Sequence, residues 1–303
     1  MKRDFTKVLD LTADECTYLL KRAGFMKRMR QARGEYRPLS GKSLAMIFEK
    51  ASTRTRVSFE LGMKELGGNT LYLSAAETQI GRGEAISDTG RVLSRYVDGI
   101  MIRTYAQETV EELARWSSVP VINGLSDLYH PCQILSDLST IWELKGDPRG
   151  LKIAYVGDGN NMANSWIEAA ILLGLNMTVA FPEEYRPAPA LEVLARDNEN
   201  LIFTHDPAKA ADGADVINTD VWVSMGMEKE RDERIKAFAR FSVDEKLLAR
   251  AKKDVIVMHC LPAHKNEEVS EAVFERFQEV IFTQAENRLH AQKALLEWLM
   301  VEV

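Results

Sequence analysis

Short strand-like and helix-like segments alternate along this chain from Ser43 onward, and this alternation limits the folds open to it. Such an order is typical of parallel sheets covered by helices on both faces, because parallel strands need crossover connections. A first series of strands is expected at 44–48, 70–73, 99–103 and 119–123, with helices at 86–96 and 109–117. A second series of strands is expected at 151–156, 177–181, 201–204, 216–218, 255–259 and 280–282.

Two domains are expected, since 303 residues exceed what one hydrophobic core usually serves. We predict an α/β protein of two doubly wound domains, each a parallel sheet flanked by helices, joined by interdomain helices. The first domain takes residues 1–133 with a terminal helix at 285–303, residues 134–150 form a linking helix and a Gly/Pro turn, and residues 151–284 form the second domain. Ligands of such sheets bind at the carboxyl ends of the strands, so a shared cleft is expected.

Composition excludes several classes of protein. The net charge of −6 argues against a general binder of nucleic acid or anionic membranes. We expect no secretory signal, since no long apolar stretch follows the charges at the N-terminus, and no apolar run approaches membrane-spanning length. Cys16, Cys132 and Cys260 form no metal-ligand or disulfide pattern, so neither a structural metal nor a disulfide framework is expected, and a reducing cytoplasm fits.

Residues 52–56 read Ser-Thr-Arg-Thr-Arg and lie between an expected strand and a helical pattern that starts at Val57. Hydroxyl groups at a helix start can cap it, and the helix dipole there attracts anions. Two guanidinium groups in the same turn favour a phosphate dianion. The turn therefore predicts a phosphate site, against the alternative of an ordinary cap with two solvated arginines.

Several polar side chains follow expected strands. Arg103 ends one strand, His130-Pro131-Cys132-Gln133 precedes the linking helix, Asp220 opens a loop to Gly226, and His259-Cys260-Leu261-Pro262 closes another strand. Any single one is explained equally well as a cap or a turn residue. Their joint placement at strand ends predicts a functional rim.

The segment Gly157-Asp158-Gly159-Asn160-Asn161 follows a strand and opens a helix, as a dinucleotide-binding fingerprint does. Met162 stands where the third glycine would be, so a nicotinamide-dependent dehydrogenase is only weakly supported. Its ribose would need an acidic residue after the next strand, and Glu183 and Glu184 lie beyond Pro182 in an expected loop. Two neighbouring amides suit an amino-acid ligand, because they donate to a carboxylate and accept from an ammonium.

Four of these motifs, in this order and across essentially the whole chain, resemble the aspartate/ornithine carbamoyltransferase family. The Ser-Thr-Arg-Thr-Arg and His-Pro-Cys-Gln motifs resemble carbamoyltransferases in general. Ser224-Met225-Gly226 and His259-Cys260-Leu261-Pro262 resemble the branch that acts on ornithine and are absent from the aspartate branch. A relative acting on putrescine, N-acetylornithine or aspartate, and a non-catalytic phosphate-binding subunit, remain alternatives.

The resemblance implies transfer of the carbamoyl group from carbamoyl phosphate to the side-chain amine of L-ornithine, giving citrulline and phosphate, a step of arginine biosynthesis. It implies no cofactor and no metal. It also implies a cytoplasmic homotrimer with shared active sites, without nucleic-acid or membrane partners.

The resemblance also assigns roles to residues. The groups that bind carbamoyl phosphate are Ser52, Thr53, Arg54, Thr55, Gln79, Arg103, His130, Gln133, Cys260, Leu261 and Arg288. Among these, Gln79 reaches the phosphate of a neighbouring subunit, Arg103 and His130 hold the carbonyl oxygen with Thr55, and Gln133 holds the carbamoyl nitrogen.

Ornithine is bound by Asn161, Asp220, Ser224 and Met225, with Asn160 beside them, and the catalytic residues are Arg103, His130, Asp220 and Cys260. The amine must lose a proton before it attacks. A Cys260 thiolate or the substrate phosphate could take that proton, while Cys260 could also be an ordinary buried thiol.

Overall fold

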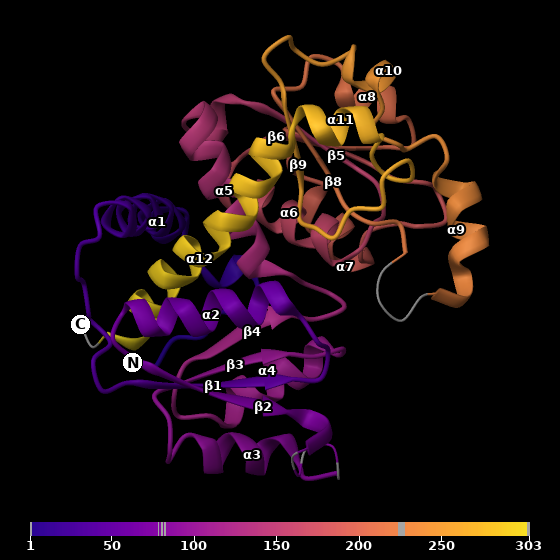
Figure 1. The fold of residues 1–303 in the computed structure, drawn as a ribbon. Coiled ribbons are helices and arrows are strands. Elements are labelled where there is room, and N and C mark those ends of the chain that lie inside the picture. Colours follow the sequence, from indigo (N-terminus) through magenta and orange to yellow (C-terminus); the bar gives the residue numbers. More distant parts are fainter. Residues whose placement is uncertain (1, 78, 80, 82, 224–227, 302–303) are drawn as a thin grey trace. The chain divides into compact units, whose positions relative to one another are not determined.

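The structure is a computed structural model, and it describes residues 2–77, 79, 81, 83–223 and 228–301. It divides into two compact units (Figure 1). Unit 1 comprises Met1–Ser139 and Glu286–Val303, and unit 2 comprises Thr140–Ala285. Each unit contains a parallel sheet flanked by helices, which confirms the predicted fold class.

The sheet of unit 1 has the strand order β2-β1-β3-β4, and every pairing is parallel. Its strands are β1 (Ser43–Phe48), β2 (Asn69–Ser74), β3 (Gly99–Arg103) and β4 (Val121–Leu125). The chain places β2 on one side of β1 and β3 on the other. The strand order therefore reverses between β1 and β3, and ligands of open α/β sheets bind beyond the carboxyl ends of such a strand pair.

Helices cover both faces of this sheet, and Figure 1 shows α2 and α3 on opposite sides. Unit 1 contains α1 (Ala13–Gln31), α2 (Thr53–Glu65), α3 (Ile86–Leu93) and α4 (Gln107–Trp116). Ala45 and Ile100 pack in one apolar cluster with Leu113 of α4. Gly62 of α2 packs on Leu289 of the C-terminal helix. One face of the sheet thus packs on α4, while α2 packs on the C-terminal helix.

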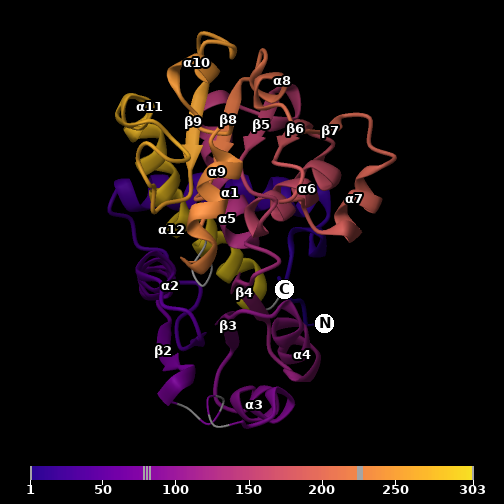
Figure 2. The ribbon, with the colours of Figure 1, turned by 90° about the vertical axis from the view of Figure 1, so that its right-hand side faces the viewer.

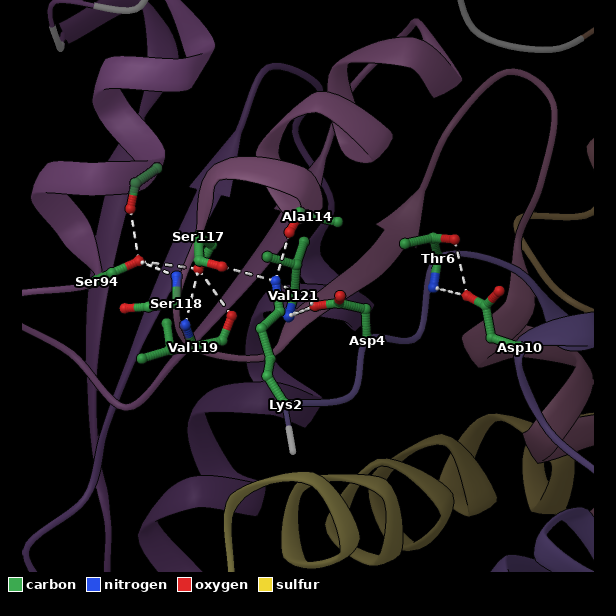
Figure 3. A network of polar contacts seen from close by, with 11 residues as sticks. Lys2, Asp4, Thr6, Asp10, Ser94, Ala114, Ser117, Ser118, Val119 and Val121 are labelled. Carbon is green, nitrogen blue, oxygen red and sulfur yellow. Dashed lines mark hydrogen bonds and ion pairs between the residues drawn. The ribbon is translucent and has the colours of Figure 1, made fainter.

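The N-terminal segment runs beside β4 and closes that edge of the sheet (Figure 3). The Phe5 amide donates to Val121 O at 2.8 Å, and the Val121 amide donates to Asp4 Oδ1 at 2.8 Å. Lys2 Nζ donates to Ser117 O at 2.8 Å, at the end of α4. These bonds satisfy backbone groups that an open edge strand would leave exposed.

The sheet of unit 2 has the order β7-β6-β5-β8-β9, again all parallel, and Figure 2 shows the strands in this sequence from β9 to β7. The strands are β5 (Lys152–Val156), β6 (Asn176–Ala180), β7 (Leu201–Thr204), β8 (Val216–Thr219) and β9 (Ile256–His259). The order reverses between β5 and β8, so the ligand position expected from topology lies beyond their carboxyl ends.

The helices of unit 2 are α6 (Asn161–Leu173), α7 (Pro189–Ala195), α8 (Pro207–Ala211), α9 (Arg231–Phe238), α10 (Glu245–Leu248) and α11 (Glu271–Arg276). Ala154 and Val156 of β5 share an apolar cluster with Phe238 of α9 and Leu248 of α10. On α6, Trp166 is fully buried.

Two further helices contribute residues to both units. They are α5 (Pro131–Lys145) and α12 (Gln278–Met300). Among the described residues, no helix is long and apolar enough to cross a bilayer.

One predicted strand is wrong. Residues 280–282 lie inside α12, which also begins earlier than the expected terminal helix at 285. The buried residues Phe277, Ile281, Gln284 and Arg288 are spaced i, i+4, i+7 and i+11, which is the period of a helix rather than of a strand. A short apolar run carries no period of its own, and the flanking residues decide the element.

Several boundaries also moved, among them the end of the helix expected at 86–96, which is α3 at Ile86–Leu93. The strand predicted at 119–123 is β4 at Val121–Leu125, since it starts only after Pro120, which has no N–H to donate. Helix α2 starts at Thr53 rather than at Val57, so the expected polar turn is itself the first turn of the helix.

Candidate functional site

The start of α2 lies directly after the carboxyl end of β1, at the reversal point of the first sheet. Ser52 is the N-cap, and its Oγ accepts the Thr55 amide at 3.3 Å. Thr55 is buried, Ser52 and Arg54 are half-buried, and Thr53 is exposed. A 13-residue helix whose N-terminus is open to solvent in this way attracts an anion through its dipole and its first amide groups.

The two arginines of this turn point to different partners. Arg56 pairs with Glu60 at 2.9 Å, and its guanidinium lies 4.0 Å from the ring centroid of Tyr72. Arg54 instead is one of the positive charges that act on His130. The interpretation of residues 52–56 as a double-arginine site therefore needs correcting, because Glu60 and Tyr72 engage Arg56, whereas the charge of Arg54 acts on His130.

A buried polar cluster adjoins this helix start within unit 1. Arg288 of α12 donates through Nη1 to Gln133 Oε1 at 2.6 Å and through Nη2 to Thr55 Oγ1 at 3.1 Å. Gln133 Nε2 donates to Asp137 at 2.7 Å. These bonds fix the orientation of the Gln133 amide, with its oxygen toward Arg288.

His130, at the beginning of α5, is buried beside three guanidinium groups. Burial lowers the pKa of His130 well below its ordinary value, and the charges of Arg288, Arg103 and Arg54 lower it further. The imidazole is therefore neutral at pH 7, and its N–H can donate without adding charge. The structure thus brings Arg54, Thr55, Arg103, His130, Gln133 and Arg288 together, and the roles that the resemblance assigns to them stay predictions.

Gln79 lies in the segment between the short helix η2 (Ala75–Glu77) and α3, and it is exposed. The backbone carbonyl oxygen of Gln79 accepts a hydrogen bond from the Glu84 amide at 3.0 Å. The exposed position leaves the side chain available to another molecule, and the sequence-predicted role of Gln79 stays a prediction.

The second cluster lies at the reversal point of the sheet in unit 2, where β5, β8 and β9 end. Asp220 follows β8 and is 7% exposed. Its Oδ2 accepts from Asn160 Nδ2 at 2.9 Å, and its Oδ1 accepts from Cys260 Sγ at 2.9 Å. Cys260 is half-buried, and its thiol donates this bond to the Asp220 carboxylate.

Asn160 positions Asp220 and at the same time caps α6. Its Oδ1 accepts the Met162 amide at 2.9 Å, the Ala163 amide at 3.3 Å and the Tyr155 hydroxyl at 3.2 Å. Burial and the nearby Asp220 raise the pKa of Tyr155 well above its ordinary value, so this hydroxyl stays protonated. Asn160 is therefore best interpreted as a positioning residue, and Tyr155 is a member of the site that sequence reasoning missed.

His259 holds the turn that carries Cys260. The Leu261 amide donates to His259 Nδ1 at 2.9 Å, so Nδ1 is the acceptor and Nε2 carries the proton. Nε2 lies 2.9 Å from Glu268 Oε1. Leu261 has a left-handed φ of 61° and precedes the cis residue Pro262. Glu268 was also missed, because nothing in its local sequence marks it as a partner of His259.

A buried ion pair contacts the backbone at Trp222, two residues after Asp220. Arg234 of α9 pairs with Asp158, donates to the backbone oxygen of Trp222 and stacks on the ring of Tyr185. Burial raises the pKa of Asp158 to about 7, while the Arg234 charge opposes that rise. Arg234 and Asp158 are 76 positions apart, so sequence spacing gave no signal for this pair.

The glycine-rich segment does not have the geometry of a dinucleotide site. A Cβ at Gly159 would lie 2.3 Å from both Arg186 C and Pro187 N. Glycine is therefore required at position 159 because the backbone at Arg186 and Pro187 passes close to it, rather than because a pyrophosphate binds there.

Asn161 is the first residue of α6 and is half-buried. Ser224 and Met225 lie outside the described residues, so their predicted roles stay predictions. Asp220, His259 and Cys260 each offer a ligand atom within 4.8 Å of the others, a set of donors that a soft divalent cation also accepts.

Comparison with known families agrees with this geometry. Residues 3–143 match the profile of the aspartate/ornithine carbamoyltransferase carbamoyl-P binding domain, and residues 149–299 match that of the Asp/Orn binding domain. The chain belongs to the aspartate/ornithine carbamoyltransferase family. The resemblance inferred from the motifs is thereby confirmed.

Individual members of the aspartate/ornithine carbamoyltransferase family match nearly the whole chain. An ornithine carbamoyltransferase of Oceanobacillus iheyensis is 53% identical over 99% of this chain and 95% of its own length. One of Anoxybacillus flavithermus is 54% identical over 98% and 96%. The solved ornithine carbamoyltransferase of Pyrococcus furiosus is 51% identical, covers 99% of this chain and 98% of its own, and superposes with a TM-score of 0.95.

Proposed function

We propose that this chain is an ornithine carbamoyltransferase, which transfers the carbamoyl group of carbamoyl phosphate to the side-chain amine of L-ornithine. The products are L-citrulline and phosphate. The activity of the relatives, at about half identity over nearly the full length, supports this reaction. The observation that carries the proposal is the convergence of Arg54, Arg103 and Arg288 on a neutral His130.

Unit 1 binds carbamoyl phosphate in this proposal. The phosphate is held by Ser52, Thr53, Arg54 and Thr55 at the start of α2, where the helix dipole and one guanidinium favour its negative charge. That charge grows as the bond to the carbamoyl carbon breaks, so the same donors stabilise the transition state more than the ground state.

The carbonyl oxygen of the carbamoyl group becomes an oxyanion when the amine attacks. Arg103, His130 and Thr55 supply donors for it, and Arg288 supplies positive charge nearby. A neutral His130 suits this task because a preorganised N–H donor need not gain or lose a proton in the step. Gln133 Oε1, already fixed by Arg288, has a second lone pair for the carbamoyl N–H.

Unit 2 binds ornithine. Asp220 holds the ammonium of the amino acid, with Asn161, Ser224 and Met225 as further contacts and Asn160 fixing the Asp220 carboxylate. Cys260 and Leu261 border the reacting amine. Two acceptors are available for the amine proton, the departing phosphate and, in its thiolate form, Cys260 beside Asp220.

The proposal also covers the location, the pathway and the assembly of the enzyme. We propose that it acts in the cytoplasm, in a step of arginine biosynthesis. A homotrimer with shared sites fits the exposure of Gln79 and of the large apolar side chains Val57, Leu71 and Tyr72 on unit 1, since monomers rarely expose neighbouring groups of this size.

The decisive test is a citrulline-formation assay with ornithine, N-acetylornithine, putrescine and aspartate as competing amines. We expect the highest kcat/KM with ornithine. A higher value with any other amine would move the chain to another substrate class within the family.

Binding of carbamoyl phosphate is tested separately by calorimetry on two matched variants. Arg54→Ala should abolish detectable binding, whereas Arg56→Ala should bind as the wild type does, because Arg56 is engaged by Glu60 and Tyr72. Equal affinities of the two variants would contradict the assignment of the phosphate to this turn.

A further inference from the structure

The turn after β9 folds back on itself within unit 2. Lys265 and Val243 each form a bridge to Val269, and the Asn266 amide donates to Val269 O at 2.7 Å. Asn266 has a left-handed φ of 68°, a conformation that asparagine tolerates better than most residues. This reversal brings His264 next to Glu267 and Glu268, although they are three and four positions further along the chain.

These three residues form a cluster of potential metal ligands. Each offers one ligand atom, and the three atoms all lie within 4.8 Å of one another. The distance from His264 Nδ1 to Glu267 Oε2 is 3.7 Å. Two ligands of a tetrahedral zinc ion with bonds of about 2.1 Å are separated by about 3.4 Å, so this distance is close to that of a metal-bound pair.

Buried atoms in this cluster lack hydrogen-bond partners. Within the part of the chain that the structure describes, His264 Nδ1, Glu267 Oε2 and Glu268 Oε2 are buried and accept or donate no hydrogen bond. Glu268 is fully buried. A buried polar atom without a partner is costly, and three such atoms at one place call for a ligand that satisfies them together.

The remaining oxygens of both carboxylates are already engaged. Glu268 Oε1 accepts from His259 Nε2 at 2.9 Å and from the His264 amide at 2.6 Å. Glu267 pairs through Oε1 with Arg231. These contacts fix the two carboxylates from behind, in the manner of the outer hydrogen bonds that orient metal ligands.

We propose that His264, Glu267 and Glu268 bind a divalent cation of the zinc class. One imidazole nitrogen and two carboxylate oxygens suit Zn²⁺ or Co²⁺, and water would complete the coordination. An entry path exists, because the His264 side chain is 42% exposed and that of Glu267 is 20% exposed. The cation would hold Glu268, and Glu268 holds His259, so its role is to stabilise the turn that carries Cys260.

The test uses the full-length, untagged protein titrated with Co²⁺ and followed by absorption spectroscopy. Nitrogen and oxygen ligands give a visible d–d band alone, whereas a thiolate adds an intense charge-transfer band in the near ultraviolet. We expect a visible band that saturates at one Co²⁺ per chain without the charge-transfer band, which separates this cluster from Asp220, His259 and Cys260.

Three variants complete the experiment. His264→Gln and Glu267→Gln should each weaken Co²⁺ binding at least about tenfold while folding normally by circular dichroism. Glu275→Gln is the matched control, since it removes the same charge from an exposed carboxylate that pairs with Lys265, and it should bind as the wild type does.

Three results would overturn the proposal. They are the absence of a visible band in the wild type, a visible band that appears only with the thiolate band, and an unchanged band in both His264→Gln and Glu267→Gln.

Discussion

Replacing Asp220 by asparagine should damage the use of ornithine and spare the binding of carbamoyl phosphate. Asp220 accepts two donors on two different oxygens, Asn160 Nδ2 and Cys260 Sγ, each at 2.9 Å. Asparagine keeps one of these acceptors and turns an NH₂ group toward the other donor. It also removes the negative charge that, in our proposal, binds the ammonium of the substrate.

The size of the effect follows from the bonds that are lost. A hydrogen bond to a charged group contributes about 1.5–3 kcal/mol, and the upper value applies here because Asp220 is 7% exposed. A loss of about 3 kcal/mol corresponds to a fall of about 150-fold in kcat/KM for ornithine. The assay is citrulline formation at saturating carbamoyl phosphate, with carbamoyl phosphate affinity measured separately by calorimetry.

Asp215→Asn is the matched control. Asp215 precedes the same strand, β8, that Asp220 follows, it is equally buried, and it accepts from the Lys152 amide at 2.9 Å and from Lys252 Nζ at 2.8 Å. Its replacement should lower the free energy of unfolding but leave the KM for ornithine unchanged. The reasoning fails if both variants lose kcat/KM for ornithine equally. It also fails if Asp220→Asn weakens the binding of carbamoyl phosphate as much as it lowers kcat/KM for ornithine.

Three further predictions concern stability and titration. Burial raises the pKa of Asp158 from 3.8 to about 7, so the folded state keeps a proton that the unfolded state loses. The free energy of unfolding should therefore fall as the pH rises from about 4 to 7, by up to about 1.4 kcal/mol per pH unit. In Asp158→Asn, urea unfolding should show a shallower decline over the same pH range. Gly159→Ala should cost about 3 kcal/mol in denaturant unfolding, since its Cβ would overlap backbone atoms, whereas Gly150→Ala, with open space around it, should cost little. In Arg288→Met the pKa of His130, followed by NMR, should rise toward its ordinary value, as a nearby positive charge is lost, and an unchanged pKa would contradict the electrostatic account.

The sequence predicted the parts of the site that follow from topology. Strand ends and the helix start at Ser52 could be located from periodicity, and parallel sheets bring such ends together. Side-chain contacts that depend on the path of the backbone could not be located in this way. Arg234 meets Asp158 across 76 positions, and the Tyr155 hydroxyl reaches Asn160 across the turn between β5 and α6.

The same limit explains two errors in the prediction. Arg56 looked equivalent to Arg54 in the sequence, but a helix that starts at Thr53 turns it toward Glu60, one helical turn further on. The run at 280–282 looked like a strand because three residues are too few to reveal a period.

The discontinuity of unit 1 has a consequence for synthesis of the chain. Residues 286–303 complete this unit, and they include Arg288, which bonds to Thr55 and Gln133. A ribosome makes these residues only after all of unit 2 has been translated. The amino-terminal part of unit 1 must therefore wait for a segment that lies beyond residue 285, and every premature stop codon before position 288 yields a product that lacks one of its buried cations.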